Sequence, residues 1–394
     1  MSDTLIPNDE KQLSEIIQKA NADKTSLRIE GGGTRQGLGN IVKSNNILSL
    51  KKLSGISLYE PGALTLVVKA GTKYKDVEKI LKAEGQRLAF EPIDHRKIYS
   101  STGDPSIGAI VAGNFSGPRR IQSGSCRDAL IGVRFVSGTG EIIKNGGRVM
   151  KNVTGLDLVK LMAGSFGTLG AISEVAFKSQ PVPERQATLE IAGLQTSEAV
   201  SLMAKALGSP FEISGAAHLS KDKNQARTLL RIEGFDSQVS YRLKKLQETI
   251  ARAYDCETIA GVKHDKLWRT IRDVEIFAGT KNPVWKISVK PSDAPIIEAQ
   301  LKDKTGAKLM FDWGGGLVWA QMPNEDNAHQ DAVRHIVRET GGHATLIRAS
   351  DVIRDKADCF QPQAVGVAKL SSCIKQKFDP AGILNPSLMQ RMRG

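Results

Sequence analysis

The clearest chemical signal in the sequence is GGGTRQGLG at residues 31–39, directly behind the short apolar and charged run SLRIE. Three consecutive glycines let a backbone approach a ligand closely, and phosphate is the usual ligand of such a loop. A Rossmann dinucleotide site requires the glycine turn to open directly into an amphipathic helix. The residues that follow instead alternate and turn, without apolar side chains at helical spacing until Tyr74. The sequence therefore predicts a phosphate loop between strands, not a Rossmann site.

Metal-ligating residues are sparse and scattered. The four cysteines, Cys126, Cys256, Cys359 and Cys373, form no CxxC pair, which argues against an iron–sulfur cluster and structural zinc. The six histidines form no HxH or HExxH motif. We therefore expect no metal site built within this chain.

The composition is that of a globular chain with an excess of positive charge. Its 394 residues are too many for one compact core and predict two domains. No stretch approaches the ~20 apolar residues of a membrane span, and the polar start is unlike a targeting peptide, so we expect a cytoplasmic location. The net charge of +13 is spread along the chain with 5% aromatic residues, which favours anionic ligands or partners over nucleic acid.

The order of predicted elements changes near residues 180–185, QPVPER, where we place a domain boundary. Before it, helices interrupt strands, and a hairpin turns at Gly138–Gly140. After it, the pattern β-α-β-β-α is followed by a helix and then by β-α-β-β-α-β. This order predicts two ferredoxin-like units in one antiparallel sheet with helices on one face. The predicted domains are 1–181, a cap domain at 182–350, and a C-terminal segment at 351–394.

The motifs now point to a known family. GGGTRQGLG, SIGAIVAGNFSGPRR, SGSCRDALIGVRFVSGTGE and GSFGTLGAISE occur in the order found in the FAD domain of vanillyl-alcohol-oxidase (PCMH-type) flavoproteins, which the chain resembles. The closing KFDPAGILNPSLM resembles the C-terminal signature of FAD-linked oxidases of 2-hydroxy acids. Within that group, ISVKPSDAP, FDWGGGLVWA and GGHAT resemble the FAD-binding (E) subunits of bacterial glycolate oxidases. The implied fold class is α+β: a two-subdomain FAD-binding domain plus an α+β cap.

The resemblance implies which residues bind FAD. The first pyrophosphate loop corresponds to Gly31, Gly32, Gly33, Thr34 and Arg35, and the second to Ser106, Ile107, Gly108, Asn114 and Gly117. Two later loops correspond to Gly124, Ser125 and Asp128, and to Gly167, Thr168, Leu169, Gly170 and Ile172; Asn385 corresponds to a position beside the flavin ring. Ala109 stands where the family usually has a second glycine, and Asp104–Pro105 enlarge the entry of that loop. Since no histidine or cysteine stands at the covalent attachment positions, we expect non-covalent FAD.

The predicted cap offers a few residues for substrate chemistry. Lys286, Arg348 and Trp313 lie where the carboxylate of a 2-hydroxy acid would be held, although each could equally be surface or core. His343 is a candidate base, or a histidine with a structural role at a strand start. Arg119–Arg120 could contact an anion, a partner chain or solvent. The paired histidines that place a metal in the catalytic relatives have no counterpart here.

The resemblance implies an FAD-binding subunit of a heteromeric glycolate oxidase that converts glycolate to glyoxylate. A homologous catalytic flavoprotein subunit and an iron–sulfur subunit would be its partners, and any contact with the inner face of a membrane would go through them. Two alternatives stay open at this point. One is a stand-alone FAD-dependent 2-hydroxy-acid dehydrogenase, and the other is a flavin-fold interaction subunit without redox activity.

Overall fold

The computed structural model describes residues 3–44, 46–147, 155–221, 225–325 and 327–390. A small parallel sheet of order β1-β3-β2 opens the chain, formed by β1 (Asp3–Leu5), β2 (Leu27–Glu30) and β3 (Asn46–Ser49). Helix α1 (Glu10–Ala22) begins at Asp9, whose side chain accepts a hydrogen bond from the Gln12 backbone N–H, as an N-cap does. Its buried Leu13 and Ile17 pack with Leu27 and Leu48 of the sheet.

A five-stranded antiparallel sheet of order β4-β5-β9-β7-β8 follows, and helices cover it. Its strands are β4 (Ile56–Glu60), β5 (Thr65–Lys69), β7 (Leu130–Val136), β8 (Ile142–Gly146) and β9 (Ala171–Lys178). The helices of this part are α2 (Tyr74–Ala83), α3 (Arg96–Tyr99), α4 (Ile107–Ala112), α5 (Arg120–Ser123), α6 (Cys126–Ala129) and α7 (Leu158–Met162). The predicted hairpin is confirmed, because β7 and β8 pair antiparallel on either side of Gly138–Gly140. A short pair joins β6 (Gln86–Arg87) to β10 (Gln180–Pro181).

The predicted pair of ferredoxin-like units is confirmed as one eight-stranded antiparallel sheet of order β14-β11-β13-β12-β16-β17-β15-β18. The first unit contains β11 (Arg185–Ala192), α8 (Thr196–Leu207), β12 (Ile213–Leu219), β13 (Arg227–Gly234), α9 (Asp236–Thr249) and β14 (Cys256–Ala260). After α10 (Gly261–Arg272), the second contains β15 (Val284–Ser288), α11 (Ala294–Thr305), β16 (Lys308–Asp312), β17 (Leu317–Gln321), α12 (Gln330–Glu339) and β18 (His343–Arg348). The units join where β12 pairs with β16.

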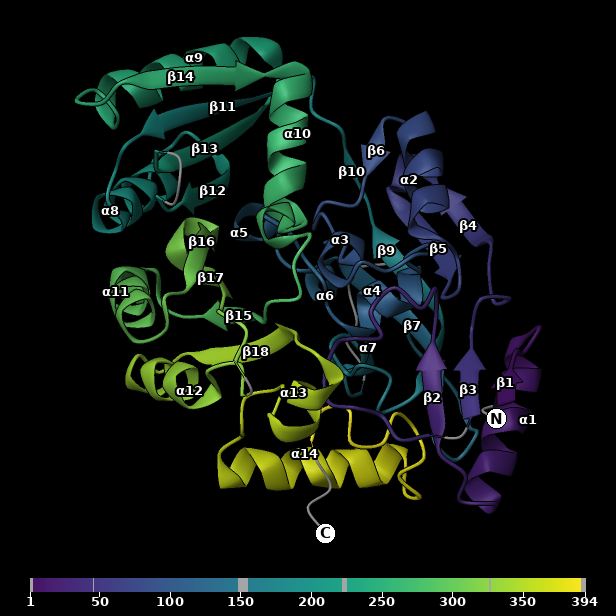
Figure 1. Ribbon diagram of the computed structural model, residues 1–394. Helices are drawn as coiled ribbons and strands as arrows, with labels where there is room; N and C mark the ends of the chain where they lie inside the picture. Colours follow the sequence, from purple (N-terminus) through teal and green to yellow (C-terminus); the bar gives the residue numbers. More distant parts are fainter. Residues whose placement is uncertain (1–2, 45, 148–154, 222–224, 326, 391–394) are drawn as a thin grey trace.

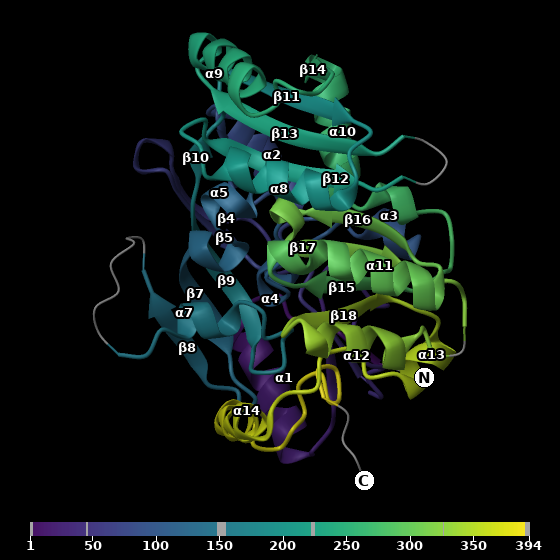
Figure 2. The ribbon, with the colours of Figure 1, turned by 90° about the vertical axis from the view of Figure 1, so that its left-hand side faces the viewer.

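The two faces of the eight-stranded sheet have different partners. Alternate residues such as Leu230 and Ile287 pack under α8, α9, α11 and α12, which lie on one face, as Figure 2 shows. The opposite face carries Met310 and Trp319, which pack with Ile93 and Phe115 from the first part of the chain. Helix α10 packs on this second face through Trp268. The period of two along each strand thus directs one side chain to the helices and the next to the N-terminal part.

The end of the chain returns to its beginning. After α13 (Asp351–Lys356) and α14 (Val365–Phe378), the backbone N–H of Leu27 donates to the Ile383 carbonyl (2.8 Å) and that of Asn385 to the Leu27 carbonyl (2.9 Å). The C-terminal tail thereby lies beside β2, the strand that directly precedes the glycine loop. Helix α14, which leads into this tail, lies at the bottom of the view in Figure 1.

Candidate functional site

A cavity of about 360 Å³ opens where the glycine loop leaves β2. Its walls come from residues far apart in the sequence: the loop itself, α4, the turn before β9, and the C-terminal tail. Of the predicted cofactor residues, those lining it are Gly31, Gly32, Gly33, Thr34, Arg35, Ser106, Gly108, Gly167, Gly170, Ile172 and Asn385. The fold therefore gathers segments of the motifs around one space.

The glycines at this cavity are required first by the protein's own packing. A Cβ on Gly32 would lie 1.7 Å from the Asp104 carbonyl oxygen, and one on Gly108 would lie 2.6 Å from the Ala70 side chain. Contacts below 3.0 Å are not tolerated without movement of the backbone. The nearest obstacle to a side chain at Gly32 is therefore the loop around Asp104, which packs directly on this glycine.

Two buried polar atoms among the cavity-lining residues have no hydrogen-bond partner in the described chain: Nη1 of Arg35 and Oγ of Ser106. The rest of the Arg35 guanidinium is held in place. Its Nε donates to Nδ1 of His95 (3.1 Å), its Nη2 donates to the Ile93 carbonyl (3.0 Å), and it lies over the Phe115 ring at 4.5 Å. Burial lowers the pKa of Arg35 to about 10, so the group stays charged at neutral pH. An unsatisfied arginine nitrogen and a hydroxyl beside glycine-rich backbone fit a phosphate-bearing ligand.

His95 holds Arg35 and is itself neutral. The histidine is 2% exposed, and burial together with the charges of Arg35 and Lys286 lowers its pKa well below the ordinary value. Since Nδ1 accepts from Arg35, the proton of the neutral ring is on Nε2. The sequence reasoning did not single out His95, because a lone histidine in EPIDHRK carries no motif.

Several predicted cofactor residues lie away from the cavity. Ile107 and Leu169 belong to the core around the five-stranded sheet. Asn114 accepts a hydrogen bond from the Arg127 backbone N–H (2.9 Å), and Thr168 Oγ1 donates to the Ser165 carbonyl (2.7 Å). Three others, Gly124, Ser125 and Asp128, lie at the start of α6, where Ser125 and Asp128 cap each other. Their cofactor contacts stay a prediction, and their local contacts favour roles in the fold.

Asn385 lines the cavity but uses its side chain as a clamp. Its Oδ1 accepts from the Ile29 backbone N–H and its Nδ2 donates to the Phe166 carbonyl, both at 2.8 Å. Asn385 is 5% exposed. It therefore ties the end of β2 to the turn before β9, across the cavity wall.

On the sheet face that meets the N-terminal part, three predicted residues come together around one indole. Lys286 Nζ lies 5.4 Å from the centre of the Trp313 ring, and the Arg120 guanidinium lies 4.5 Å from it. The Trp313 Nε1–H donates to the carbonyl of Gly117 (3.1 Å). Gly117, which the sequence predicted to bind the cofactor, thus contacts the cap and does not line the cavity. We call Arg120, Lys286 and Trp313 the Trp313 cluster. The His343 side chain keeps part of its surface exposed, and partial desolvation together with the charges of Lys286, Arg120 and Arg334 lowers its pKa.

Arg348 does not join this cluster. Its Nε donates to the Asn282 carbonyl (2.8 Å), and its Nη1 donates to the carbonyls of Ile98 (3.0 Å) and Phe277 (2.8 Å). Nη2 donates to Thr280 Oγ1 (3.1 Å). With its donors directed at protein oxygens, this buried arginine fastens β18 to α3, and the structure favours that role over the substrate-binding role that the sequence suggested.

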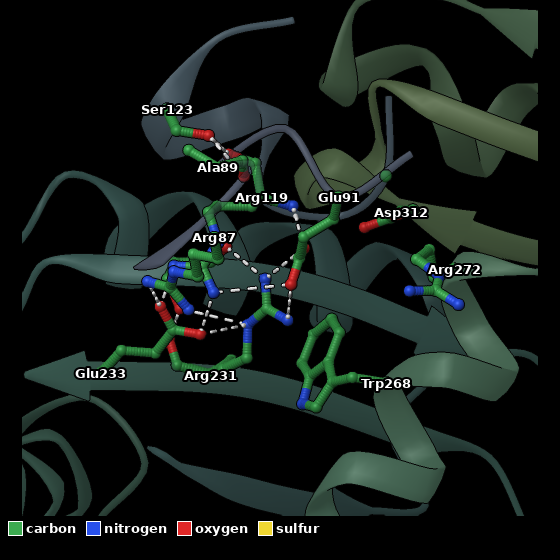
Figure 3. A network of polar contacts seen from close by, with 12 residues as sticks. Arg87, Ala89, Glu91, Arg119, Ser123, Arg231, Glu233, Trp268, Arg272 and Asp312 are labelled. Atoms are coloured by element: carbon green, nitrogen blue, oxygen red, sulfur yellow. Dashed lines mark hydrogen bonds and ion pairs between the residues drawn. The ribbon is translucent and has the colours of Figure 1, made fainter. Parts of the chain in front are cut away.

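A buried network of charges joins the cap to the N-terminal part (Figure 3). Arg231 of β13 donates from Nη1 and Nη2 to both oxygens of Glu91 (3.0 and 2.9 Å), and Arg119 forms an ion pair with Glu233. Arg87 also reaches Glu233, at 3.1 Å. The five side chains are 2–20% exposed. Arg119 of this network directly precedes Arg120 in the sequence. The network therefore also fixes the backbone that carries Arg120 toward Trp313.

Asp312, the residue before Trp313, lies beside this network. Its carboxylate accepts a hydrogen bond from the Trp313 backbone N–H (2.7 Å), and burial raises its pKa to about 7. The charge of Glu91 adds to this rise, while that of Arg231 opposes it.

Comparison with known proteins now adds to this geometry. Residues 3–146 match a family model described as an FAD binding domain. Over 378 residues the chain is 33% identical to glycolate oxidase subunit GlcE of Escherichia coli, with 96% of each chain covered. This chain belongs to the GlcE family. It is also 31% identical to glycolate oxidase subunit GlcD of Bacillus subtilis, over 48% of this chain and 39% of that protein. A solved structure of alkyldihydroxyacetonephosphate synthase superposes on 97% of this chain and 75% of its own at 17% identity, with a TM-score of 0.70, which shows the fold.

Membership of the GlcE family bears out the FAD-linked α+β fold and the resemblance drawn from the motifs. Both glycolate oxidase relatives are named as subunits. Within the described residues, no group of three or more His, Cys, Asp or Glu side chains could hold a metal ion. No helix of the described chain is long and apolar enough to cross a membrane.

Proposed function

We propose that this chain is the FAD-binding subunit of a heteromeric glycolate oxidase, an enzyme that oxidises glycolate to glyoxylate. Arg35 is the observation that carries the proposal: a buried, charged side chain beside the glycine loop with an unsatisfied nitrogen. Leaving such a nitrogen without a partner is costly, and a phosphate oxygen of the cofactor would satisfy it. The similarity to glycolate oxidase subunit GlcE supports the reaction.

The residues that would hold FAD are the backbone of Gly31–Thr34 with Arg35, and Ser106 at the start of α4. When bound, FAD supplies the acceptor for a hydride from the α-carbon of a 2-hydroxy acid. Phe115 and Phe166 give the cavity an apolar wall, and Asn385 fixes its shape from the C-terminal tail. We propose residues 1–181 as the FAD-binding domain, 182–350 as the cap that closes over it, and 351–394 as the segment that completes the cavity.

Ala109 allows a direct test, because it lines the cavity and is not completely buried. We expect Ala109→Leu to purify with little FAD, since the longer side chain would fill the space of the cofactor. Ala83→Leu, on the exposed end of α2, is the matched control and should keep full FAD content. The measurement is the ratio of flavin absorbance near ~450 nm to protein, with thermal melting to show that both variants fold. Full FAD content in Ala109→Leu would contradict the placement.

The division of labour among subunits forms a second part of the proposal. The described residues of the cap contain no group of side chains that could hold a metal ion. A lone general base accelerates a reaction typically ~10²–10⁴-fold, whereas enzymes accelerate theirs at least ~10⁶-fold. We propose a homologous flavoprotein subunit and an iron–sulfur subunit as partners that complete the reaction and carry the electrons onward. The isolated chain should then reduce an artificial dye with glycolate only negligibly, and activity should appear on addition of both partners. Robust turnover by the chain alone would favour a stand-alone dehydrogenase. Absence of flavin from this chain, both alone and when it is assembled with its partners, would favour a non-redox interaction subunit.

A further inference from the structure

The Arg35 guanidinium is a cation inside the protein that touches only neutral groups. Its Nε donates to Nδ1 of His95, its Nη2 donates to the Ile93 carbonyl, and its plane lies over the Phe115 ring. Among the described residues it forms no ion pair with a carboxylate. Arg231, at the junction with the cap, by contrast places its guanidinium on both oxygens of a glutamate. The neutral surroundings are therefore particular to the arginine at the glycine loop.

The acids whose charges act on Arg35 are engaged elsewhere. The charges of Asp94 and Asp273 raise the pKa of Arg35, against the larger effect of burial. Asp94 accepts hydrogen bonds from Arg96 at 2.7, 2.9 and 3.1 Å, and Asp273 accepts two from Arg272 at 2.8 Å. The side chain that contacts Arg35 directly is thus a histidine, although carboxylates lie close by.

His95 is held in one orientation by its own surroundings. Its ring lies against those of Tyr99 and Phe115, with centroids 5.9 and 4.8 Å apart. The residues around it are fastened to the cap: the Asp94 backbone N–H donates to a carboxylate oxygen just after α10 (2.9 Å), and the Tyr99 hydroxyl donates to a carbonyl of β18 (2.5 Å). A ring fixed in this way presents Nδ1 to Arg35 without further ordering, as a preorganised site requires.

A neutral partner leaves the charge of Arg35 available to a ligand. His95 stays neutral near pH 7, because burial and the charges of Arg35 and Lys286 lower its pKa. A carboxylate in its place would form an ion pair with the guanidinium and would repel a phosphate beside it. Nη1 of Arg35 has no hydrogen-bond partner in the described chain, and Arg35 lines the cavity. The arrangement therefore leaves a buried charge without compensation until an anion binds.

We propose that His95 is a positioning residue for FAD: its Nδ1 holds the Arg35 guanidinium for the cofactor phosphates without cancelling the charge. The inference rests on the proposed function, because FAD is the ligand whose phosphates Arg35 would meet. His95 does not line the cavity and acts through Arg35. Its effect is consequently on the charge of the ligand: binding of FAD depends on His95, whereas binding of riboflavin, which has no phosphate, does not.

The test compares two substitutions of nearly the same shape in the full chain, stripped of flavin and titrated with FAD. His95→Asn keeps a neutral acceptor near the position of Nδ1, and His95→Asp replaces it by an anion. We expect His95→Asn to bind FAD within about threefold of the wild-type affinity and His95→Asp to bind at least about tenfold more weakly. The flavin-free His95→Asp chain should nevertheless have the higher Tm of the two, because its carboxylate pairs the buried cation. Free FAD is measured after ultrafiltration, and Tm by differential scanning fluorimetry.

His218 provides the matched control. It is 1% exposed, and its Nδ1 contacts the Thr228 hydroxyl (3.0 Å) within the cap sheet. His218→Asn and His218→Asp should change Tm and leave the FAD affinity within about twofold of wild type. Riboflavin should bind with the same affinity to wild type, His95→Asn and His95→Asp. In an Arg35→Met background, which itself binds FAD weakly, His95→Leu should weaken binding no further, because the two residues act as one unit.

The outcomes separate the two proposals. A wild-type chain that binds no FAD contradicts the proposed function and with it the role of His95. Tight FAD binding by wild type, with equal affinities in His95→Asn and His95→Asp, overturns the positioning role and leaves the proposed function intact. An equal loss of FAD and riboflavin affinity in His95→Asp also overturns it, because His95 would then support the fold of the cavity and not the charge of Arg35. A flavin-free His95→Asp chain that melts below His95→Asn overturns the description of Arg35 as an uncompensated cation.

Discussion

Neutralising Glu233 should destabilise the protein far more than neutralising an exposed acid. The side chain of Glu233 is 4% exposed and contacts three arginines, Arg87, Arg119 and Arg231. With Glu91, the network has three positive and two negative groups, so Glu233→Gln leaves three cations with one buried anion. Removing one partner of a buried ion pair costs about 3–5 kcal/mol, because the remaining charge is left without compensation.

The size of the effect on thermal melting follows from the length of the chain. At ~2.1 cal/mol/K per residue, 394 residues give an unfolding entropy of about 0.8 kcal/mol/K, so the loss corresponds to a Tm about 4–6 °C lower. Differential scanning fluorimetry measures this directly. Glu248→Gln is the control, because Glu248 is paired with Lys245 on the surface of α9, where such a pair contributes about 1 kcal/mol or less. If Glu233→Gln and Glu248→Gln melt within 1 °C of each other, the network does not hold the cap, and the reasoning is refuted.

Further predictions follow from the same residues. Asp312 lies near Arg231 and Glu91, and its pKa in the folded state is about 7, above the value of ~3.9 in the unfolded state. Between these two values the folded state binds more protons than the unfolded state. The stability that this group contributes is therefore present at low pH and is lost as the pH rises through 7. Asp312→Asn, which can still accept from the Trp313 N–H, should consequently raise Tm at pH 8 and have little effect at pH 4. Gly32→Val should lose FAD through displacement of the loop at Asp104, with a lower Tm as well, whereas an FAD-replete variant with unchanged Tm would contradict the packing. Acid precipitation should leave the flavin in the supernatant, since the described residues lining the cavity include no histidine, cysteine or tyrosine and Cys126 is buried in the core.

Much of the architecture could be predicted because strands and helices here have strong local signals. The glycine loop without a following helix, the hairpin at Gly138–Gly140 and each element of the repeated β-α-β-β-α order depend on periodicity and turn residues that are local in the sequence. Strand β14 was missed. Its burial alternates weakly, with Glu257 and Thr258 both exposed, because it is an edge strand paired on one side with β11. An edge strand with polar side chains on both faces leaves no apolar pattern to detect.

The motifs predicted which loops form the cofactor cavity, but they did not separate the residues that line it from the residues that support it. Motifs identified the residues around the cavity, and eleven of the predicted nineteen line it. The others, such as Ile107 and Ser125, occur in the same motifs because those motifs also encode the packing of α4 and the capping of α6. A motif conserves the ligand-binding backbone together with its support, and a sequence alone does not separate the two.

Arg348 shows why the cap residues needed the structure. In HATLIR, strict alternation places Arg348 with Ala344 and Leu346, on the helix-covered face of the sheet. The register between β15 and β18 shifts at Val284 and Trp285, however, so that Arg348 pairs with Val284, a residue of the face toward the N-terminal part. The extra residue of this bulge turns Arg348 toward the Ile98 carbonyl, so that its hydrogen bond links β18 to α3. Lys286 lies opposite Thr345 beyond the irregularity, keeps the alternation of its strand, and therefore projects toward Trp313 on the face that meets the N-terminal part.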